Sequence, residues 1–151
     1  TPCVILDVPH GWQPWIKNVL LSADDIVVVA TPDLTGLRNA KNIIELIKGA
    51  RPNDTPPRLV LNQVGIPKRP EIPPKDFAET MGVEPAAILG FDPAQFGQAA
   101  NNGQMIMELV PKAPVSEALR RLCRSLTGRG APDEGRASNS LLSFFKGKRS
   151  A

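Results

Sequence analysis

Residues 26–48 read IVVVATPDLTGLRNAKNIIELIK, and this stretch decides the fold class. Its first five residues are apolar and mostly β-branched, which is typical of a strand buried on both faces. Thr31-Pro32-Asp33 ends the strand, and apolar side chains then recur at helical spacing from Leu37 to Ile47. A buried strand followed directly by an amphipathic helix is the unit from which parallel α/β sheets are built.

The same alternation continues in both directions along the chain. Apolar runs at 3–6, 58–64 and 86–91 predict three more strands. Helical patterns surround Trp15 and cover residues 74–81 and 115–126. Four short strands that alternate with helices predict a doubly wound, mostly parallel α/β sheet with right-handed crossovers.

Polar residues collect at the carboxyl ends of the predicted strands, where such sheets bind ligands. These residues are Asp7, Thr31, Asn62 and Asp92. Residues of these types also serve as turn and helix-cap residues without any role in binding, so each one has a purely structural alternative.

The net charge of +3 comes from the end of the chain. Residues 1–128 carry thirteen Lys or Arg and thirteen Asp or Glu, whereas 129–151 carry five and two. Residues 129–140 predict a flexible linker, and 141–151 a basic amphipathic segment, so together they form a disordered C-terminal tail. That segment is expected to dock on an anionic membrane or a partner groove, or to have no role. Its membrane contacts would be Leu141, Leu142, Phe144, Phe145, Lys146, Lys148 and Arg149.

Several classes of protein are excluded by what the sequence lacks. Cys3 and Cys123 are too far apart in sequence for a zinc motif and predict buried thiols in a reducing compartment. A single histidine, His10, and the lack of a Gly-x-Ser-x-Gly motif argue against a Ser-His-Asp hydrolase. The chain starts without methionine and runs directly into an apolar stretch, so we expect a piece of a longer protein.

Four segments together resemble a known family. They are VILDVP at 4–9, VVVATPDLTGLRNAKNII at 27–44, LVLNQVG at 59–65 and ILGFDPAQFGQAANNGQMI at 88–106. They are similar to the second half of the deviant P-loop ATPases of the MinD/ParA superfamily. The likeness is closest to the TadZ/CpaE-type ATPases of Flp (tight adherence) pilus assembly. Residues 1–128 would then be the C-terminal portion of such an ATPase domain, within a mostly parallel P-loop NTPase sheet.

The resemblance implies a magnesium and switch region near the start of the chain. Asp7 would be the Walker B aspartate, which accepts a hydrogen bond from a water on Mg²⁺. Pro9 and His10 would lie in the switch that follows. A buried strand that ends in Asp is also common without any metal, and His10 is equally interpretable as an ordinary loop residue.

The resemblance also implies an adenine site. Asn62 is similar to the family asparagine whose amide contacts the base edge, since an amide offers a donor and an acceptor together. Asp92 and Pro93 fall in the adenine-flanking loop. The structural alternative for Asn62 is an Asx turn at the end of its strand.

The phosphate-binding half of such a site is absent from this sequence. No Gly-x-x-x-x-Gly-Lys-Ser/Thr motif or deviant form of it occurs, so no loop is present whose N–H groups would cradle phosphates. ATP and Mg²⁺ are therefore expected only together with the missing N-terminal half. The parent protein would be a weak ATPase that dimerises on nucleotide, and this segment alone would be inactive and would lack a central strand.

Three functions remain open. The first is a nucleotide-dependent assembly and localisation factor for an Flp/Tad (type IVb) pilus secretion system, which is cytoplasmic or peripheral at the inner membrane or cell pole. Its partners would be a second copy of itself and pilus machinery. The second is a ParA-like DNA-partitioning ATPase, but the balanced charge of 1–128 argues against specific DNA binding. The third is a non-catalytic polar scaffold with a decayed nucleotide site.

Trp12 and Trp15 are interpreted either as packing of the first helix or as a partner surface.

Overall fold

The computed structural model describes residues 3–9, 11 and 13–128. In chain order, the elements are α1 (Pro14–Ser22), β1 (Val27–Ala30), α2 (Leu34–Ala50), β2 (Arg58–Val64), α3 (Pro74–Met81), β3 (Pro85–Gly90), α4 (Pro93–Asn102), α5 (Ile106–Leu109) and α6 (Pro114–Thr127). None of these helices combines the length and apolar character that a membrane span requires. The predicted linker at 129–140 and tail at 141–151 lie outside the described residues.

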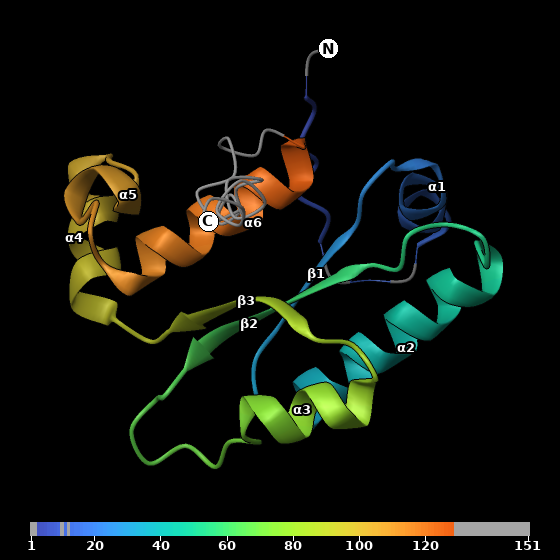
Figure 1. The fold of residues 1–151 in the computed structure, drawn as a ribbon, viewed down its shortest axis with the longest axis horizontal. Coiled ribbons are helices and arrows are strands. Elements are labelled where there is room, and N and C mark those ends of the chain that lie inside the picture. The colour runs from blue at the N-terminus through green and yellow to red at the C-terminus, as the bar shows by residue number, and fades with distance from the viewer. Residues whose placement is uncertain (1–2, 10, 12, 129–151) are drawn as a thin grey trace, which may run out of the picture.

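The three strands form one parallel sheet in the order β1-β2-β3. Leu59 of β2 is paired with Val28 of β1, and Val60 of β2 with Ala87 of β3. Helices α2 and α3 lie on one face of the sheet and α6 lies on the other (Figure 1). The predicted α/β fold with a parallel sheet between helices is confirmed.

Alternation along β2 supplies both halves of the core. Leu59 and Leu61 point to one face, where they pack in a cluster with Phe77 of α3. Val60 points to the opposite face and packs in a second cluster with Ala118 of α6. Because successive side chains of a strand alternate, one continuous apolar run can hold helices on both faces.

The predicted first strand is wrong for the described residues. Residues 3–9 are neither helix nor strand, and Val4, Ile5 and Leu6 are 78%, 88% and 63% exposed. A strand forms only where its N–H and C=O groups pair with a neighbouring strand. None of the described strands lies in register beside this run, so its apolar sequence does not produce a strand.

Two cysteines predicted to be buried lie at the surface, and Trp15, for which two interpretations were open, is also exposed. Both Cys3 and Cys123 are exposed free thiols, which corrects the prediction of burial. Trp15 is 48% exposed, and its Nε1 donates to Gln13 Oε1 at 2.6 Å, which favours the surface interpretation of this side chain. Trp12 and His10 lie outside the described residues.

β1 leaves one corner of the sheet uncovered. Among the described strands it pairs only with β2, so its other edge has no partner there. Val28 and Ala30 are buried in the cluster beneath α2. Val27 and Val29 point the other way and are 36% and 60% exposed, because α6 packs against β3 rather than β1.

Candidate functional site

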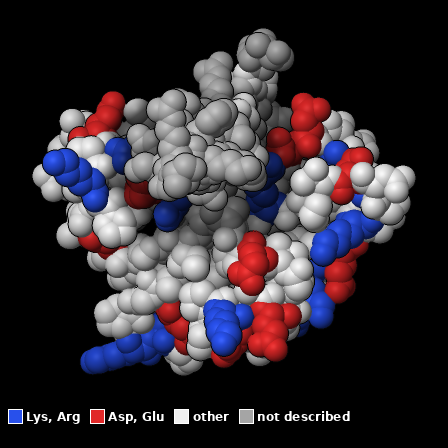
Figure 2. Space-filling view, in the orientation of Figure 1, with Lys and Arg blue, Asp and Glu red and all other residues white. Residues whose placement is uncertain are grey.

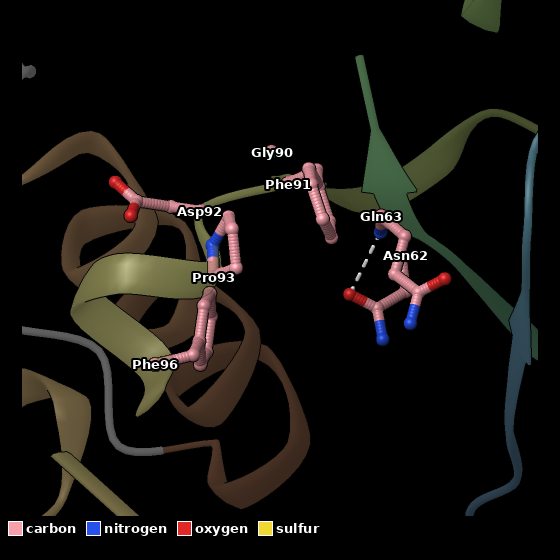
Figure 3. Close-up of a pocket in the computed structure, with 7 residues that line it drawn as sticks. All are labelled: Asn62, Gln63, Gly90, Phe91, Asp92, Pro93 and Phe96. Carbon is pink, nitrogen blue, oxygen red and sulfur yellow. Dashed lines mark hydrogen bonds between the residues drawn. The ribbon is translucent and has the colours of Figure 1, made fainter. Parts of the chain in front are cut away.

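An open cleft lies at the carboxyl ends of β2 and β3 (Figure 3). It is lined by Asn62, Gln63, Gly90, Phe91, Asp92, Pro93 and Phe96. The volume of this space is about 200 Å³. Sites that enclose a whole drug-sized ligand span roughly 300–1,000 Å³. The cleft therefore suits one planar fragment of a ligand rather than a complete nucleotide.

The strand wall of the cleft is a β-bulge in β2. Leu61 is paired with Ile88 and Val64 with Gly90, so two residues of β2 stand opposite one residue of β3. The second of these two, Gln63, has a φ of 58°, in the left-handed region. Bulges re-aim side chains at functional sites, and a non-glycine residue in this conformation persists only where its surroundings hold it.

Asn62 supplies the polar group that faces the cleft. Its Oδ1 accepts the N–H of Gln63 at 2.9 Å, which is drawn as the dashed line in Figure 3. Within the described part of the chain, the Nδ2 of Asn62 makes no hydrogen bond. Since an amide oxygen has two lone pairs, Asn62 still offers a ligand one acceptor position and its donor hydrogens. The predicted turn role is therefore compatible with ligand binding.

Two aromatic rings face the same space. Phe91 follows β3 directly and is 39% exposed, and Phe96 lies in the first turn of α4 and is 37% exposed (Figure 3). The N–H of Phe91 donates to the carbonyl of Val64 at 2.8 Å, which holds the two strand ends together. Half-exposed aromatic faces beside a free amide can stack on a planar base while the amide reads its edge.

The start of α4 closes the cleft on the far side. Asp92 is the N-cap, and its Oδ1 accepts the N–H of Gln95 at 2.9 Å. Its carboxylate points away from the cleft, whereas Pro93 lies along it (Figure 3). Asp92 thus has the helix-cap role that was its structural alternative, and its predicted contact with adenine stays a prediction.

The turn between β1 and α2 is held by a second cap. The hydroxyl of Thr31 donates to Asp33 Oδ2 at 2.6 Å, and the N–H of Gly36 donates to Asp33 Oδ1 at 2.7 Å. These two bonds, with a smaller effect of the nearby Arg69 charge, hold the pKa of Asp33 below its ordinary value. Thr31 is therefore committed to this turn.

The loop after β2 is tied by an ion pair that sequence reasoning missed. Glu71 accepts the N–H groups of Gly65 and Ile66 at 2.9 and 3.0 Å, and the Arg69 guanidinium pairs with it at 2.8 Å. The Gly65 N–H, followed by the Ile66 N–H and Arg69, holds the pKa of Glu71 below its ordinary value. Arg69 also donates to the carbonyl of Gln63.

The predicted magnesium residue Asp7 and the predicted switch residue Pro9 are not brought to the cleft. Asp7 and Pro9 lie in the exposed or half-exposed run 3–9 and are absent from the cleft lining. Within the part of the chain that the structure describes, no three His, Cys, Asp or Glu side chains gather into a group that could hold a metal. Of the predicted site residues, the structure brings together Asn62, Asp92 and Pro93.

Four lining residues, Gln63, Gly90, Phe91 and Phe96, were not singled out from sequence. Phe91 and Phe96 carried a usable signal, because one follows a strand end directly and the other lies three residues after Pro93, one helical turn away. Gln63 carried none, since its place depends on the bulge, which is a property of two strands in register.

Comparison with known proteins places this geometry in context. No family model matches the chain. The septum site-determining protein MinD of Bacillus subtilis is 30% identical over 154 residues, a match that covers 97% of this chain. Over nearly its whole length the chain is therefore similar in sequence to MinD. It spans only 57% of the length of that curated relative.

Solved structures agree on the fold of this MinD-like chain. The cell division ATPase MinD of Pyrococcus furiosus superposes with a TM-score of 0.68 at 22% identity, covering 82% of this chain and 51% of that one. The ParA family ATPase of Chlorobium tepidum gives 0.55 at 20% identity, covering 76% and 45%. At these identities the likeness concerns the fold alone.

Proposed function

We propose that this chain is the base-binding half of a MinD/ParA-type ATPase and that its cleft holds adenine. The proposal rests on the Asn62 amide, whose Nδ2 has no partner in the described residues. This amide lines one cleft with Phe91 and Phe96 at the strand ends, in a chain similar to MinD. Asn62 would read the adenine edge, while the rings and Pro93 would stack on its faces. The phosphates and Mg²⁺ would lie beyond the cleft, with Asp7 holding the ion through water.

The uncovered corner of the sheet supports the proposal that this chain is one half of a larger ATPase domain. A phosphate-binding half would add a strand between β1 and residues 3–8, which would cover Val29 and give Val4 to Leu6 a partner. Such a full-length protein would bind ATP with Mg²⁺, dimerise on nucleotide and hydrolyse ATP slowly. It would work in the cytoplasm, with residues 141–151 as a peripheral contact to the inner membrane.

The experiment for the base site is an NMR titration of the 151-residue chain with AMP, and with GMP for comparison. We expect AMP to shift the Asn62 side-chain amide and the Phe91 and Phe96 rings. Asn62→Ala should weaken AMP binding about five- to tenfold, since one net hydrogen bond contributes about 1 kcal/mol. Asn42→Ala, on the exposed face of α2, is the matched control. Equal AMP affinity of the two variants would contradict the proposed adenine site.

The same chain should release no phosphate from ATP with Mg²⁺, because the sequence contains no Walker A loop. Reproducible Mg²⁺-dependent turnover by the purified chain would contradict the division of the site into two halves.

For the cellular role, we propose the Flp/Tad pilus assembly factor. The signals for that resemblance are DVPH at 7–10, followed by a tryptophan-bearing helix, and TPDLTGLRNAKN at 31–42. Deleting the gene should then abolish pili and leave septum placement normal. The reverse result would assign the protein to cell division instead.

Acidic and basic side chains are interspersed on the face shown in Figure 2, which gives no support to the DNA-partitioning alternative. A scaffold with a decayed site predicts normal piliation in the Asn62→Ala strain.

A further inference from the structure

Side chains hold three backbone groups at the end of the cleft wall, two on Gln63 and one on Gly65. The N–H of Gln63 is held by Asn62, the carbonyl of Gln63 by Arg69, and the N–H of Gly65 by Glu71. The two charged side chains also bond each other, with Arg69 Nη2 and Nε at 2.8 and 3.2 Å from Glu71 Oε1. We call Arg69 and Glu71, with these bonds, the brace.

The brace is partly shielded from water and anchored to the rest of the fold. The side chains of Arg69 and Glu71 are 22% and 18% exposed. The next residue, Ile72, donates its N–H to the carbonyl of the fully buried Pro32 at 2.7 Å. The brace therefore joins the bulge at the end of β2 to the turn at the end of β1, and it cannot shift without moving one of them.

The brace acts where the backbone conformation is energetically unfavourable. Gln63 has a φ of 58° and Gly65 a φ of 88°. Only glycine adopts such values without cost, so the Gln63 conformation has to be stabilised by its contacts. Charge-assisted hydrogen bonds are about twice as strong as neutral ones. Arg69 supplies one to the carbonyl of Gln63, and Glu71 supplies another to the N–H of Gly65, directly after this residue and Val64.

We propose that Arg69 and Glu71 are positioning residues for the base cleft: they hold the β2 bulge in the conformation that presents the Asn62 amide to the ligand. The proposal rests on the base binding proposed above. Neither residue lines the cleft, so both act only through the backbone at Gln63 and Gly65 and thus through Asn62. The brace makes the cleft preformed before any ligand arrives.

A double-mutant cycle on AMP binding by the 151-residue chain tests this. Glu71→Gln keeps the size of the side chain and removes its charge, and Arg69→Lys keeps the charge but cannot reach Glu71 and Gln63 together. Each should weaken AMP binding at least fivefold in the wild-type background. In the Asn62→Ala background each should change it less than twofold, because the residue through which the brace acts is gone. The exposed Glu79→Gln on α3 is the matched control and should change neither.

Two results would overturn the proposal. One is an equal loss in both backgrounds, which would make the brace a stability element only, and the other is no loss in either. Unchanged dispersion of the core amide resonances would show that the variants remain folded.

A second measurement keeps the test independent of the base-binding proposal. If the wild-type chain binds no AMP, the proposed adenine site fails, and the Asn62 side-chain amide resonance of the free protein then decides the brace. A displaced resonance in Glu71→Gln and Arg69→Lys, with faster hydrogen exchange at Gly65 and Ile66, supports positioning. A resonance identical to wild type overturns it.

Discussion

At the scale of single residues, the turn after β1 shows how closely backbone segments approach beside the cleft. Gly36 lies in the first turn of α2, where its N–H donates to the side chain of the N-cap residue Asp33. A Cβ placed on Gly36 would lie 2.1 Å from the carbonyl oxygen of Thr31. That oxygen belongs to the backbone, so it cannot rotate away. The glycine is therefore required by space rather than by its φ.

Replacing Gly36 by alanine should destabilise the fold. Overpacking of this kind costs about 1–3 kcal/mol, which exceeds the gain of about 0.5–1 kcal/mol from alanine in a helix. We expect urea unfolding to report a net loss of about 1–2 kcal/mol. Gly49→Ala, in the same helix with open space around it, is the control and should raise the free energy of unfolding. If the Gly36→Ala protein were as stable as the Gly49→Ala protein, the close approach of Gly36 to the Thr31 carbonyl would be contradicted.

At the scale of elements, α1 is held to the domain by one side chain from the end of α2. Arg51 Nη1 donates to the carbonyls of Ala23 and Leu20 at 2.7 and 3.2 Å, at the C-terminal end of α1. The Arg51 side chain is only 19% exposed and also pairs with Asp54. Ile16 is the one buried residue of α1, so these two hydrogen bonds add to a small apolar contact with the rest of the described fold.

Arg51→Met should loosen α1 more than it changes the sheet. Two carbonyls lose a charged donor, which is worth about 1–3 kcal/mol in total. Hydrogen exchange should rise at the amides of α1, including that of Ala23, while β2 stays protected. Arg38→Met, at an exposed position of α2 without a bonded partner in the described residues, should leave α1 unchanged. Equal exchange in the two variants would show that Arg51 does not hold the helix.

The elements also show what sequence could and could not predict. The strand at 58–64 and the helix at 74–81 have their predicted bounds, because apolar runs and a closing Gly82 with a φ of 60° are local signals. The run at 3–6 carries the same local signal and forms no strand, since pairing depends on a distant neighbour. Asn62 was found by its place at the carboxyl end of a strand and by its likeness to the family asparagine. Gln63, Arg69 and Glu71 were missed because a bulge and its brace exist only once two strands are in register.

At the scale of the whole molecule, two carboxylates hold neighbouring strand ends. Asp33 caps the turn after β1, where the bonds from Thr31 and Gly36 lower its pKa, and Glu71 holds the loop after β2, where the Gly65 N–H, followed by the Ile66 N–H and Arg69, lowers its pKa. Groups whose pKa is lowered by folding stabilise the fold above their unfolded value. That contribution is lost as the pH falls through the folded pKa. Acid should therefore weaken the edge of the sheet that carries the cleft.

The pH dependence of unfolding checks this contribution. The ordinary values are 3.8 for Asp33 and 4.5 for Glu71, so the contribution is complete above about pH 5 and declines below it. A double variant with Asp33→Asn and Glu71→Gln should be less stable than wild type at pH 6. It should also lose less stability between about pH 5 and 3. The exposed pair Asp24→Asn with Glu79→Gln should follow the wild-type profile. Parallel profiles for both double variants would contradict the assignment.

The uncovered corner at β1 has a consequence for handling the purified chain. Among the described strands, β1 has one edge without a partner, and such an edge is a template on which other chains can add strands. The exposed Val29 and the exposed apolar run from Val4 to Leu6 add apolar surface that favours this association. Solubility rather than unfolding should then limit the concentration that the isolated chain tolerates. Light scattering that rises with concentration at temperatures below the unfolding transition is the expected sign. A charged residue in place of Val29 should suppress it, and would equally block whatever normally occupies that corner.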